Sequence, residues 1–434
     1  MSALAAETRR LTPSTLDALL RGGVGPLIWL VLIFCLHRYF FGLAGDSAAF
    51  YTKVLLDIGI AIILAVSLNI VNGFTGQFSI GHAGFMLTGG YIAAAITYYG
   101  TVRIWGDKQF HGGLLSTADN PALFEGPWVT GGDGLFLAAC LAGGVAAAIA
   151  GYLVGLPSLR LRGDYLAIVT LGFGEIVRVL FQNSANQITS IKKVQDASIW
   201  QLCGALGRSL GLTGVPFYTS LFWVYLFVAV TIIVAYRIKQ SSYGRALLSI
   251  REDEVAAEAM GIHTTRMKIR AFVISAFFAG VAGALYAHLL GSINAGELGF
   301  VKSFDIVIMV VLGGMGSISG VVLAAILLTV LPEYLRSPTA VWHYALVLSV
   351  VVLLIRQRRG VRPAAALLIG AVIVEAIRLV AGWAQVNLAE FRMVIYALLL
   401  ILVMILRPQG LFGIHEIWDF FRRGAATAPR EART

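Results

Sequence analysis

The sequence predicts an all-α polytopic membrane protein with about 10–12 transmembrane helices, broken or re-entrant segments included. Two observations lead to this fold class. Hydrophobic residues make up 58% of the 434 residues and charged residues 13%, and the mean hydropathy is +0.82. Several runs of about 17 to 20 largely apolar residues are each long enough to cross the hydrocarbon core as a helix. This composition excludes a water-soluble globular domain.

The candidate spans, in chain order, are 26–43, 52–71, 83–99, 134–156, 164–181, 217–236, 272–291, 340–355, 364–382 and 391–406. An arginine-containing tail, 1–25, precedes the first apolar run, and no small-residue cleavage motif follows that run. We therefore interpret the run as a retained span rather than a signal peptide. The transmembrane domain is expected to cover 26–413, followed by a tail at 414–434.

The net charge of +10 is concentrated in a few loops, which favours a membrane-sidedness signal over nucleic-acid binding. Basic residues gather at 160–162, 237–270, 356–362 and 407–423. Because cytoplasmic loops carry an excess of lysine and arginine, all four clusters are predicted to be cytoplasmic, as are both tails. The polar stretches 100–133 and 182–216 are then predicted to face outward.

Segment 304–336 interrupts this simple alternation of sides. It must cross the membrane an even number of times, or enter and return, for the flanking segments to lie where their charges require. Its two apolar halves flank the sequence GGMGSISG, and the first half is too short for a full span. We expect a broken or re-entrant hairpin with its bend at depth, which is tolerated only when buried in protein or lining a wet cavity.

A second glycine-rich interruption, VNGFTGQFSIGHAGFMLTGG, occupies 71–90. Two glycine-interrupted apolar segments in different halves of a transporter point to a substrate path. The candidate path residues are Asn72, Gly73, Gln77, Ser79, Gly81, His82, Gly313, Gly314, Gly316 and Ser317. Small polar groups and glycines suit a weakly binding path, although a lone histidine is more often a packing residue.

The sequence REDEVAAEAMGI, 251–262, lies in the predicted cytoplasmic loop 237–271 and is too charged to enter lipid. It predicts a helix of about eleven residues, capped either by Ser249 with Glu252 or by Asp253, and ended by Gly261. A small apolar stripe is formed by Val255, Ala256, Ala259 and Ile262. The stripe favours a docking face; the alternative is a solvated loop helix that merely joins two spans.

Other charged and reactive groups give little sign of chemistry. Glu175 with Arg178, and Glu375 with Arg378, have the spacing of structural pairs on one helix face. Asp57, which either packs against another helix or faces water, is the best candidate for an ion relay. No P-loop, H-E-x-x-H motif or catalytic constellation occurs, and the cysteines at 35, 140 and 203 suggest no metal site. We predict no catalytic residue, no metal and no cofactor bound by this chain.

Five blocks, found in order, resemble the permeases of ABC transporters that import branched-chain amino acids, the LivM type. The blocks occupy 73–94, 159–178, 243–288, 305–333 and 398–413. The third block resembles the family's ATPase-coupling helix, and the matching residues are Gly244, Arg245, Glu252, Asp253, Glu254, Ala256, Ala257, Gly261 and Ile262. An apparent extra hairpin at 337–390 and the stretch 182–212 depart from the family pattern.

The resemblance implies an inner-membrane subunit of a bacterial importer. Its expected partners are two ABC ATPase subunits that bind ATP and Mg²⁺, a second permease of the LivH type, a periplasmic substrate-binding protein and the lipid bilayer, with no nucleic acid. The absence of a P-loop agrees with ATP hydrolysis by a separate subunit. A urea or amide permease is the nearest alternative; an ion-coupled secondary transporter is a more distant one, and a membrane enzyme has little support.

Overall fold

The computed structural model describes residues 46–116, 127–158 and 165–334, together with 401, 410, 413 and 416. Several expected segments lie outside the described residues: the spans 26–43, 340–355 and 364–382, the hairpin 337–390 and the N-terminal tail. Of the expected span 391–406 only Ile401 is described, and of the C-terminal tail only Glu416. Within the described part the architecture is all-α, as predicted, with one two-residue strand pair.

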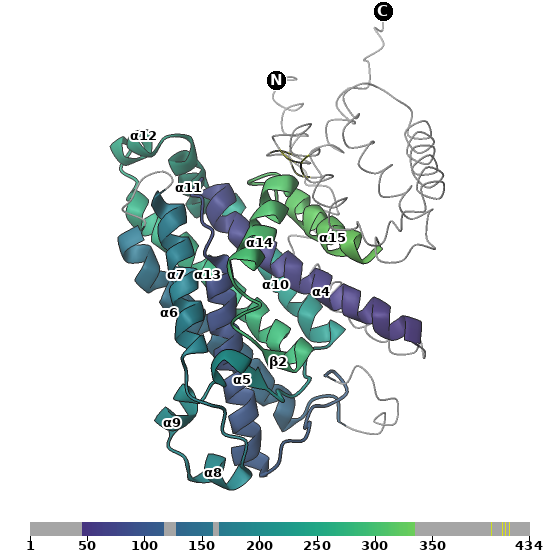
Figure 1. Cartoon of the computed structure of the whole chain (residues 1–434). Coiled ribbons are helices and arrows are strands. Elements are labelled where there is room, and N and C mark those ends of the chain that lie inside the picture. Colours follow the sequence, from purple (N-terminus) through teal and green to yellow (C-terminus); the bar gives the residue numbers. More distant parts are fainter. Residues whose placement is uncertain are drawn as a thin grey trace, which may run out of the picture.

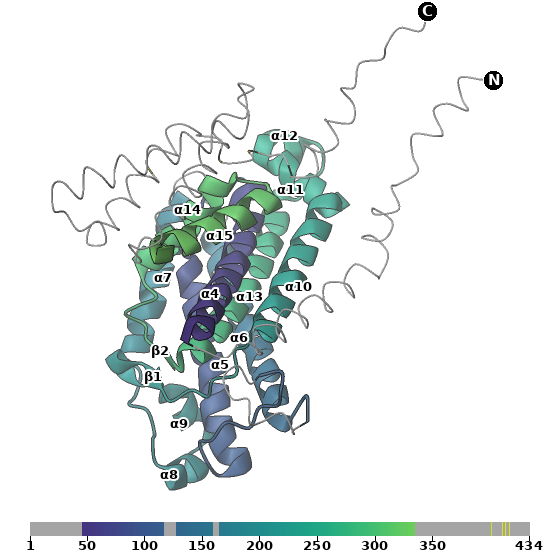
Figure 2. The same cartoon turned by 90° about the vertical axis from the view of Figure 1, so that its right-hand side faces the viewer.

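Six long helices form the bundle (Figures 1 and 2). They are α4 (Asp46–Asn69), α5 (His82–Trp105), α6 (Gly131–Ser158), α7 (Tyr165–Gln182), α10 (Leu221–Gln240) and α13 (Thr264–Leu290). Five stretches are long and apolar enough to cross a membrane: Phe50–Phe74, Gly131–Ser158, Tyr165–Gln182, Leu221–Gln240 and Thr264–Leu290. These helices confirm a multi-pass membrane protein. The expected span 272–291 begins earlier, at Thr264, because the basic residues before it are already helical.

Helices α5, α6 and α13 meet at glycines on each of the three. A Cβ added to Gly89 of α5 would overlap the Cα of Gly280 on α13, and a Cβ on Gly283 would overlap the carbonyl oxygen of Met86. A Cβ on Gly143 of α6 would lie 2.5 Å from the carbonyl oxygen of Gly89. Small residues allow helix backbones in lipid to touch, so these glycines set the spacing of the bundle's centre.

The two ends of the bundle carry different short elements (Figures 1 and 2). One end holds α8 (Ile191–Asp196), α9 (Ile199–Gly204), η4 (Arg208–Leu210) and the antiparallel pair of β1 (Leu212–Thr213) with β2 (Ser292–Ile293). The opposite end holds α11 (Ser242–Glu252) and α12 (Glu254–Ala259). The charge pattern predicted that 182–216 and 237–271 lie on opposite sides, and their placement at opposite ends agrees with this.

Both predicted interruptions of the helices are present. A π-helical turn, η2 (Ile70–Phe74), continues α4, and the chain then runs without regular structure to α5. The second interruption separates α14 (Phe300–Gly313) from α15 (Ile318–Tyr334). We call residues 70–81 the first break and residues 314–317 the second break. The pair of Glu175 and Arg178 is also confirmed, with 2.6 Å between Oε2 and Nε.

Candidate functional site

The first break is a largely buried turn, with Gly76 and Phe78 exposed, and it carries hydrogen bonds within itself. The side chain of Asn72 accepts a hydrogen bond from the Ser79 amide at 3.2 Å and donates one to the Ser79 carbonyl at 3.5 Å. His82 is buried at the start of α5, where its Nε2 lies 2.8 Å from the hydroxyl of Ser67. Gly81 lies against the Thr170 carbonyl, which leaves no room for a Cβ. Of the polar groups expected along the path in this break, Asn72 and Ser79 therefore bond to each other, whereas His82 bonds Ser67.

Gln77 differs from its neighbours in the first break. Its side chain is partly buried, and its Oε1 has no hydrogen-bond partner among the described residues. A buried acceptor without a partner is costly, so this atom is available to a donor that is absent from the described part of the chain.

The second break is packed directly against the first. The side chain of Asn69 accepts a hydrogen bond from the Gly316 amide at 2.9 Å and donates one to the Ser317 carbonyl at 3.2 Å. A Cβ on Gly73 would lie 2.5 Å from the Gly316 nitrogen, so the two backbones are in contact. Gly314 and Gly316 have φ values of +102° and +95°, which favour glycine. The structure thus brings together the two sets of candidate path residues.

Two cations from the charged loop end hydrogen-bond the carbonyl groups of the breaks. Arg251 Nη1 lies 2.8 Å from the carbonyl oxygen of Gly73 and 3.3 Å from that of Met315. Lys239 Nζ lies 2.7 Å from the carbonyl oxygen of Gly316. The last carbonyls of a helix have no partner within it and attract positive charge, so the contact at Gly73 stabilises the end of η2. The contacts at Met315 and Gly316 satisfy carbonyls of the turn between α14 and α15.

A carboxylate completes the arrangement at the start of α15. Glu416 accepts hydrogen bonds from the amides of Ile318 and Ser319, each at 3.0 Å, and pairs with Lys239 at 2.5 Å. Burial alone would raise the pKa of Glu416, but the bonds from Lys239, Ser319 and the Ile318 amide hold it below its ordinary value of 4.5. An anion at a helix N-terminus satisfies its free amides.

These contacts place the second break beside Lys239 in the last turn of α10 and beside Arg251 at the end of α11. That the bend lies at membrane depth stays a prediction. The sequence analysis missed Asn69, Lys239, Arg251 and Glu416; a polar residue just before a glycine-rich break was the available signal for Asn69.

The charged segment is two helices rather than one. Asp253 has extended backbone angles and caps α12, accepting hydrogen bonds from the amides of Val255 at 2.9 Å and Ala256 at 3.1 Å. The cap at Ser249 is wrong, because its hydroxyl donates to the Ala246 carbonyl instead. The single helix of about eleven residues is therefore wrong as well: α11 ends at Glu252, since Asp253 competes for the backbone there. The predicted stop at Gly261 is confirmed, with φ +85°.

Helix α12 is held firmly against α13. Lys268, almost fully buried, pairs with Glu254 at 2.6 Å, and the Thr264 hydroxyl donates to Glu258 at 2.6 Å. Ala257 is buried beneath α12, so it does not reach the outer surface. At the start of α11, Gly244 is buried against the Ile238 carbonyl.

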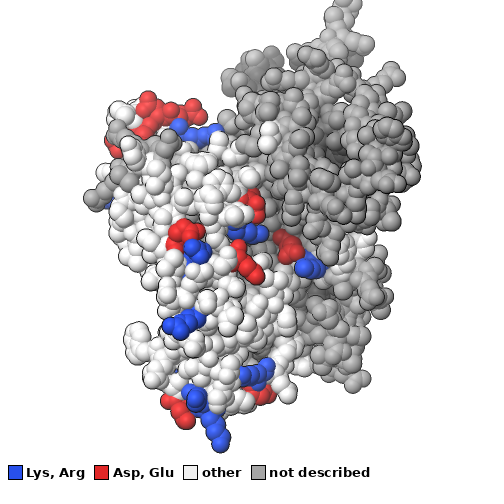
Figure 3. All heavy atoms as spheres, in the orientation of Figure 1, with Lys and Arg blue, Asp and Glu red and all other residues white. Residues whose placement is uncertain are grey.

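The outward face of α12 is apolar and ringed by acid. Val255 is 62% exposed and Met260 83% exposed, and Ala256 and Ala259 are also exposed. Figure 3 shows acidic side chains gathered at this end of the molecule. Of the residues expected in the stripe, Ile262 is only partly exposed, and Met260 belongs to the face although the sequence analysis left it out. We call Val255, Ala256, Ala259 and Met260 the α12 face.

Removing the α12 cap is expected to loosen this helix alone. Asp253→Ala leaves two amides without their acceptor and should cost about 0.5–2 kcal/mol. Hydrogen exchange of the α12 amides, followed by mass spectrometry, should accelerate several-fold, while α13 is unaffected. Glu252→Ala, an exposed neighbour at the end of α11, is the matched control; equal acceleration in both variants would contradict the capping role.

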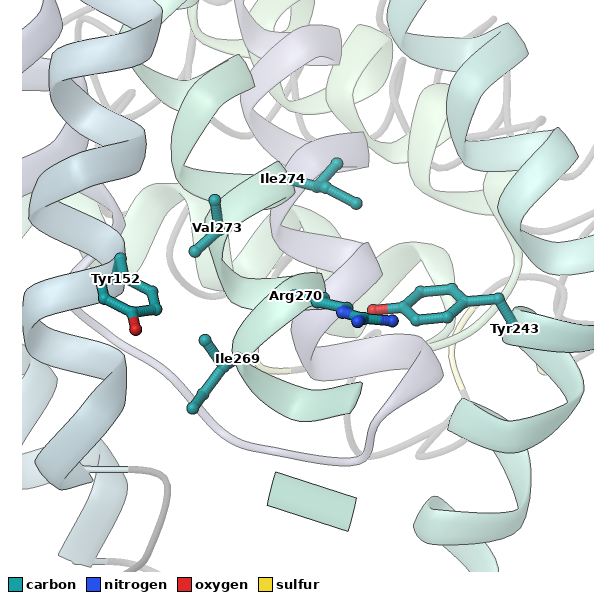
Figure 4. Close-up of a pocket in the computed structure, with 6 residues that line it drawn as sticks. All are labelled: Tyr152, Tyr243, Ile269, Arg270, Val273 and Ile274. Atoms are coloured by element: carbon teal, nitrogen blue, oxygen red, sulfur yellow. The ribbon is translucent and has the colours of Figure 1, made fainter. Parts of the chain in front are cut away.

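An apolar hollow lies near the charged end, between α6, α11 and α13 (Figure 4). It is lined by Tyr152, Tyr243, Ile269, Arg270, Val273 and Ile274. Arg270 points toward the ring hydroxyl of Tyr243, which itself donates to the Met267 carbonyl at 2.9 Å. The hollow lacks the converging polar groups of a small-molecule site. No group of three potential metal ligands occurs among the described residues.

Comparison with known proteins gives one family match. The model for "Branched-chain amino acid transport system / permease component" matches residues 50–357. The LivM permease of Salmonella typhimurium is 35% identical over 297 residues, 64% of this chain and 61% of that protein. A probable LivM of Methanocaldococcus jannaschii is 27% identical, over 63% and 78% of the two chains.

The relatives also include a sugar permease. The fructose import permease FrcC of Rhizobium meliloti is 27% identical over 228 residues, 50% of this chain and 61% of that protein. The chain covers 61% of the length of the Salmonella LivM permease, which is less than two thirds of that relative. No solved structure matches the chain.

Proposed function

Because the chain belongs to the permease-component family of branched-chain amino acid transport systems, we propose that it is the membrane-spanning subunit of an ATP-driven importer for branched-chain or related amino acids. Two ABC ATPase subunits, a second permease of the LivH type and a periplasmic binding protein complete the proposed assembly. The proposed location is the bacterial inner membrane, with both tails in the cytoplasm.

The α12 face is the observation that carries this proposal. It presents Val255 and Met260 to the outside from a segment whose carboxylates exclude it from lipid. A small apolar centre with a charged rim is the usual anatomy of a protein–protein contact. Because Lys268 and Thr264 hold α12 against α13, force applied to this face is transmitted into a long helix. Docking of a separate ATPase is the role that fits these properties.

The two breaks are the proposed substrate path. Asn72, Ser79, Gln77 and Ser317 offer weak, neutral hydrogen-bonding groups, which suit a zwitterionic cargo that must be released rather than held. No strongly charged site is needed in a permease that receives cargo from a binding protein. The outer end with α8 and α9 is the proposed side for that protein.

Co-purification tests the docking role. The tagged chain is co-expressed with the ABC ATPase subunits encoded in the same genome and isolated in detergent. Replacing Val255 and Met260 with glutamate should reduce ATPase recovery at least about 10-fold, the equivalent of roughly 1.4 kcal/mol. Leu210→Glu, at a residue of the opposite end that is about as exposed as Met260, should recover the ATPase as the unsubstituted chain does. Full recovery by the doubly substituted chain would refute docking at α12.

Uptake by the assembled transporter tests the cargo. Proteoliposomes containing the complete assembly are supplied with the binding protein, ATP and one radiolabelled compound: leucine, urea or fructose. Leucine uptake that requires ATP supports the proposal. Preferential uptake of urea or fructose would reassign the cargo, and leucine uptake driven by an ion gradient without ATP would support a secondary transporter instead.

A further inference from the structure

Arg251 is placed where the charged segment meets both breaks. It lies in the last turn of α11, next to Glu252 and two residues before Asp253, the cap of α12. Its Nη1 donates to Gly73 in the first break and to Met315 in the second. Within the described residues of α11 and α12, no other side chain hydrogen-bonds either break.

The glycines of the breaks make room for this side chain. A Cβ on Gly76, whose φ is +70°, would lie 2.9 Å from Arg251 Cγ. A Cβ on Gly316 would lie 2.7 Å from Arg251 Nη1. Each break thus contributes one glycine that the arginine packs against. The fit is steric as well as electrostatic, and it fixes the guanidinium between two segments that are far apart in sequence.

The acceptors are backbone carbonyls at the ends of helices. Gly73 lies in η2, at the end of the helix that α4 begins, and Met315 lies just beyond α14. A single guanidinium therefore joins the ends of two helices to a third helix, α11. Because only one residue separates α11 from α12, a displacement of α12 moves Arg251 with it.

We propose that Arg251 is the positioning residue that transmits movement of the α12 face to both breaks at once. The inference rests on the proposed function, in which a partner displaces α12. When α12 moves, the two carbonyls are pulled together or released together, so the first and second breaks change shape in step. Glu416 bonds the first amides of α15 and pairs with Lys239 of α10, so these two residues hold the start of α15 independently of Arg251.

We call the two hydrogen bonds from Arg251 to Gly73 and Met315 the clamp. A distance measurement tests the clamp without any transport. Spin labels are placed at Met260→Cys on α12 and Phe78→Cys in the first break, both exposed, in the full chain with its three own cysteines replaced by alanine. Pulsed electron resonance should give a narrow distance distribution. Arg251→Ala should broaden it at least about two-fold, because two charge-assisted hydrogen bonds are lost. Arg237→Ala, an exposed arginine near the end of α10, should leave it narrow.

Transport by the complete assembly then tests what the clamp does. Arg251→Ala should retain the ATPase subunits and hydrolyse ATP within about two-fold of the unsubstituted assembly, while leucine uptake per ATP falls about 10-fold or more. Arg251→Lys keeps the charge but lacks the planar guanidinium, so it should restore part of the uptake.

The outcomes separate this inference from the proposed function. An unbroadened distance distribution in Arg251→Ala, or normal uptake per ATP, overturns the clamp and leaves the importer intact. Loss of ATPase binding together with uptake would make Arg251 a folding or docking residue and also overturns it. Broadening in Arg251→Ala with no ATP-driven uptake by the unsubstituted assembly overturns the proposed function alone.

Discussion

Gly283→Ala is expected to destabilise the helix bundle by about 3 kcal/mol or more. A Cβ at this position would overlap the Met86 carbonyl of α5 and approach the Gly90 nitrogen at 3.0 Å. Backbone atoms cannot rotate away as a flexible side chain would, so α13 must separate from α5 along their shared length. Overpacking in cores costs about 1–3 kcal/mol, and a backbone-to-backbone contact lies at or above the top of that range.

Thermal unfolding of the isolated chain in mild detergent measures the effect, with the yield of monodisperse protein as a second readout. Gly172→Ala on α7 is the matched control, because nothing lies within 4 Å of its added Cβ. That control should be neutral or gain about 0.5–1 kcal/mol from improved helix propensity. Equal stability of Gly283→Ala and Gly172→Ala would show that α5 and α13 do not touch as described.

Glu416→Gln is expected to destabilise the second break by about 3 kcal/mol. Removing one partner of a buried ion pair costs about 3–5 kcal/mol, and the lower value applies because Lys239 is partly exposed. The change leaves Lys239 with no carboxylate and keeps one acceptor oxygen for the amides of Ile318 and Ser319. Accelerated hydrogen exchange at the start of α15, together with a lower midpoint in thermal unfolding, would report the loss. Glu252→Gln, an exposed carboxylate at the end of α11, should change the midpoint little.

The same carboxylate predicts a pH dependence. The pKa of Glu416 in the folded chain lies below 4.5, so its contribution to stability is complete above about pH 4.5 and is lost as the pH falls through the lower folded value. The unsubstituted chain should therefore lose stability relative to Glu416→Gln as the pH falls from about 5 through the lowered pKa of Glu416. Parallel curves across that window would mean that Glu416 is not ionised in its pairing with Lys239.

The sequence was sufficient for the features that depend on local pattern. Apolar runs located the six long helices, although α13 begins eight residues before its expected span, and glycine-rich stretches located both breaks. Asp253 and Gly261 marked the limits of α12 because capping chemistry is local. The error at Ser249 arose because two cap residues stood close together, and nothing in one sequence decides which side chain the backbone adopts.

The contacts that join distant segments were beyond the reach of the sequence. In the sequence, Arg251 and Lys239 are two more basic residues of a predicted cytoplasmic loop. Glu416 is part of a predicted tail. Their roles depend on which carbonyls and amides the fold leaves free at the ends of α14, α15 and η2. Lys268 likewise counted only as a sidedness signal, whereas it is buried against Glu254.

Arg251 and Lys239 donate hydrogen bonds to backbone carbonyls, a group that every amino acid supplies. Nearby side chains can therefore be substituted without loss of these hydrogen bonds, provided that Gly76 and Gly316, which leave room for Arg251, are kept. Substitutions in these segments can therefore change the side chains that line the breaks while the backbone contacts with Arg251 and Lys239 persist.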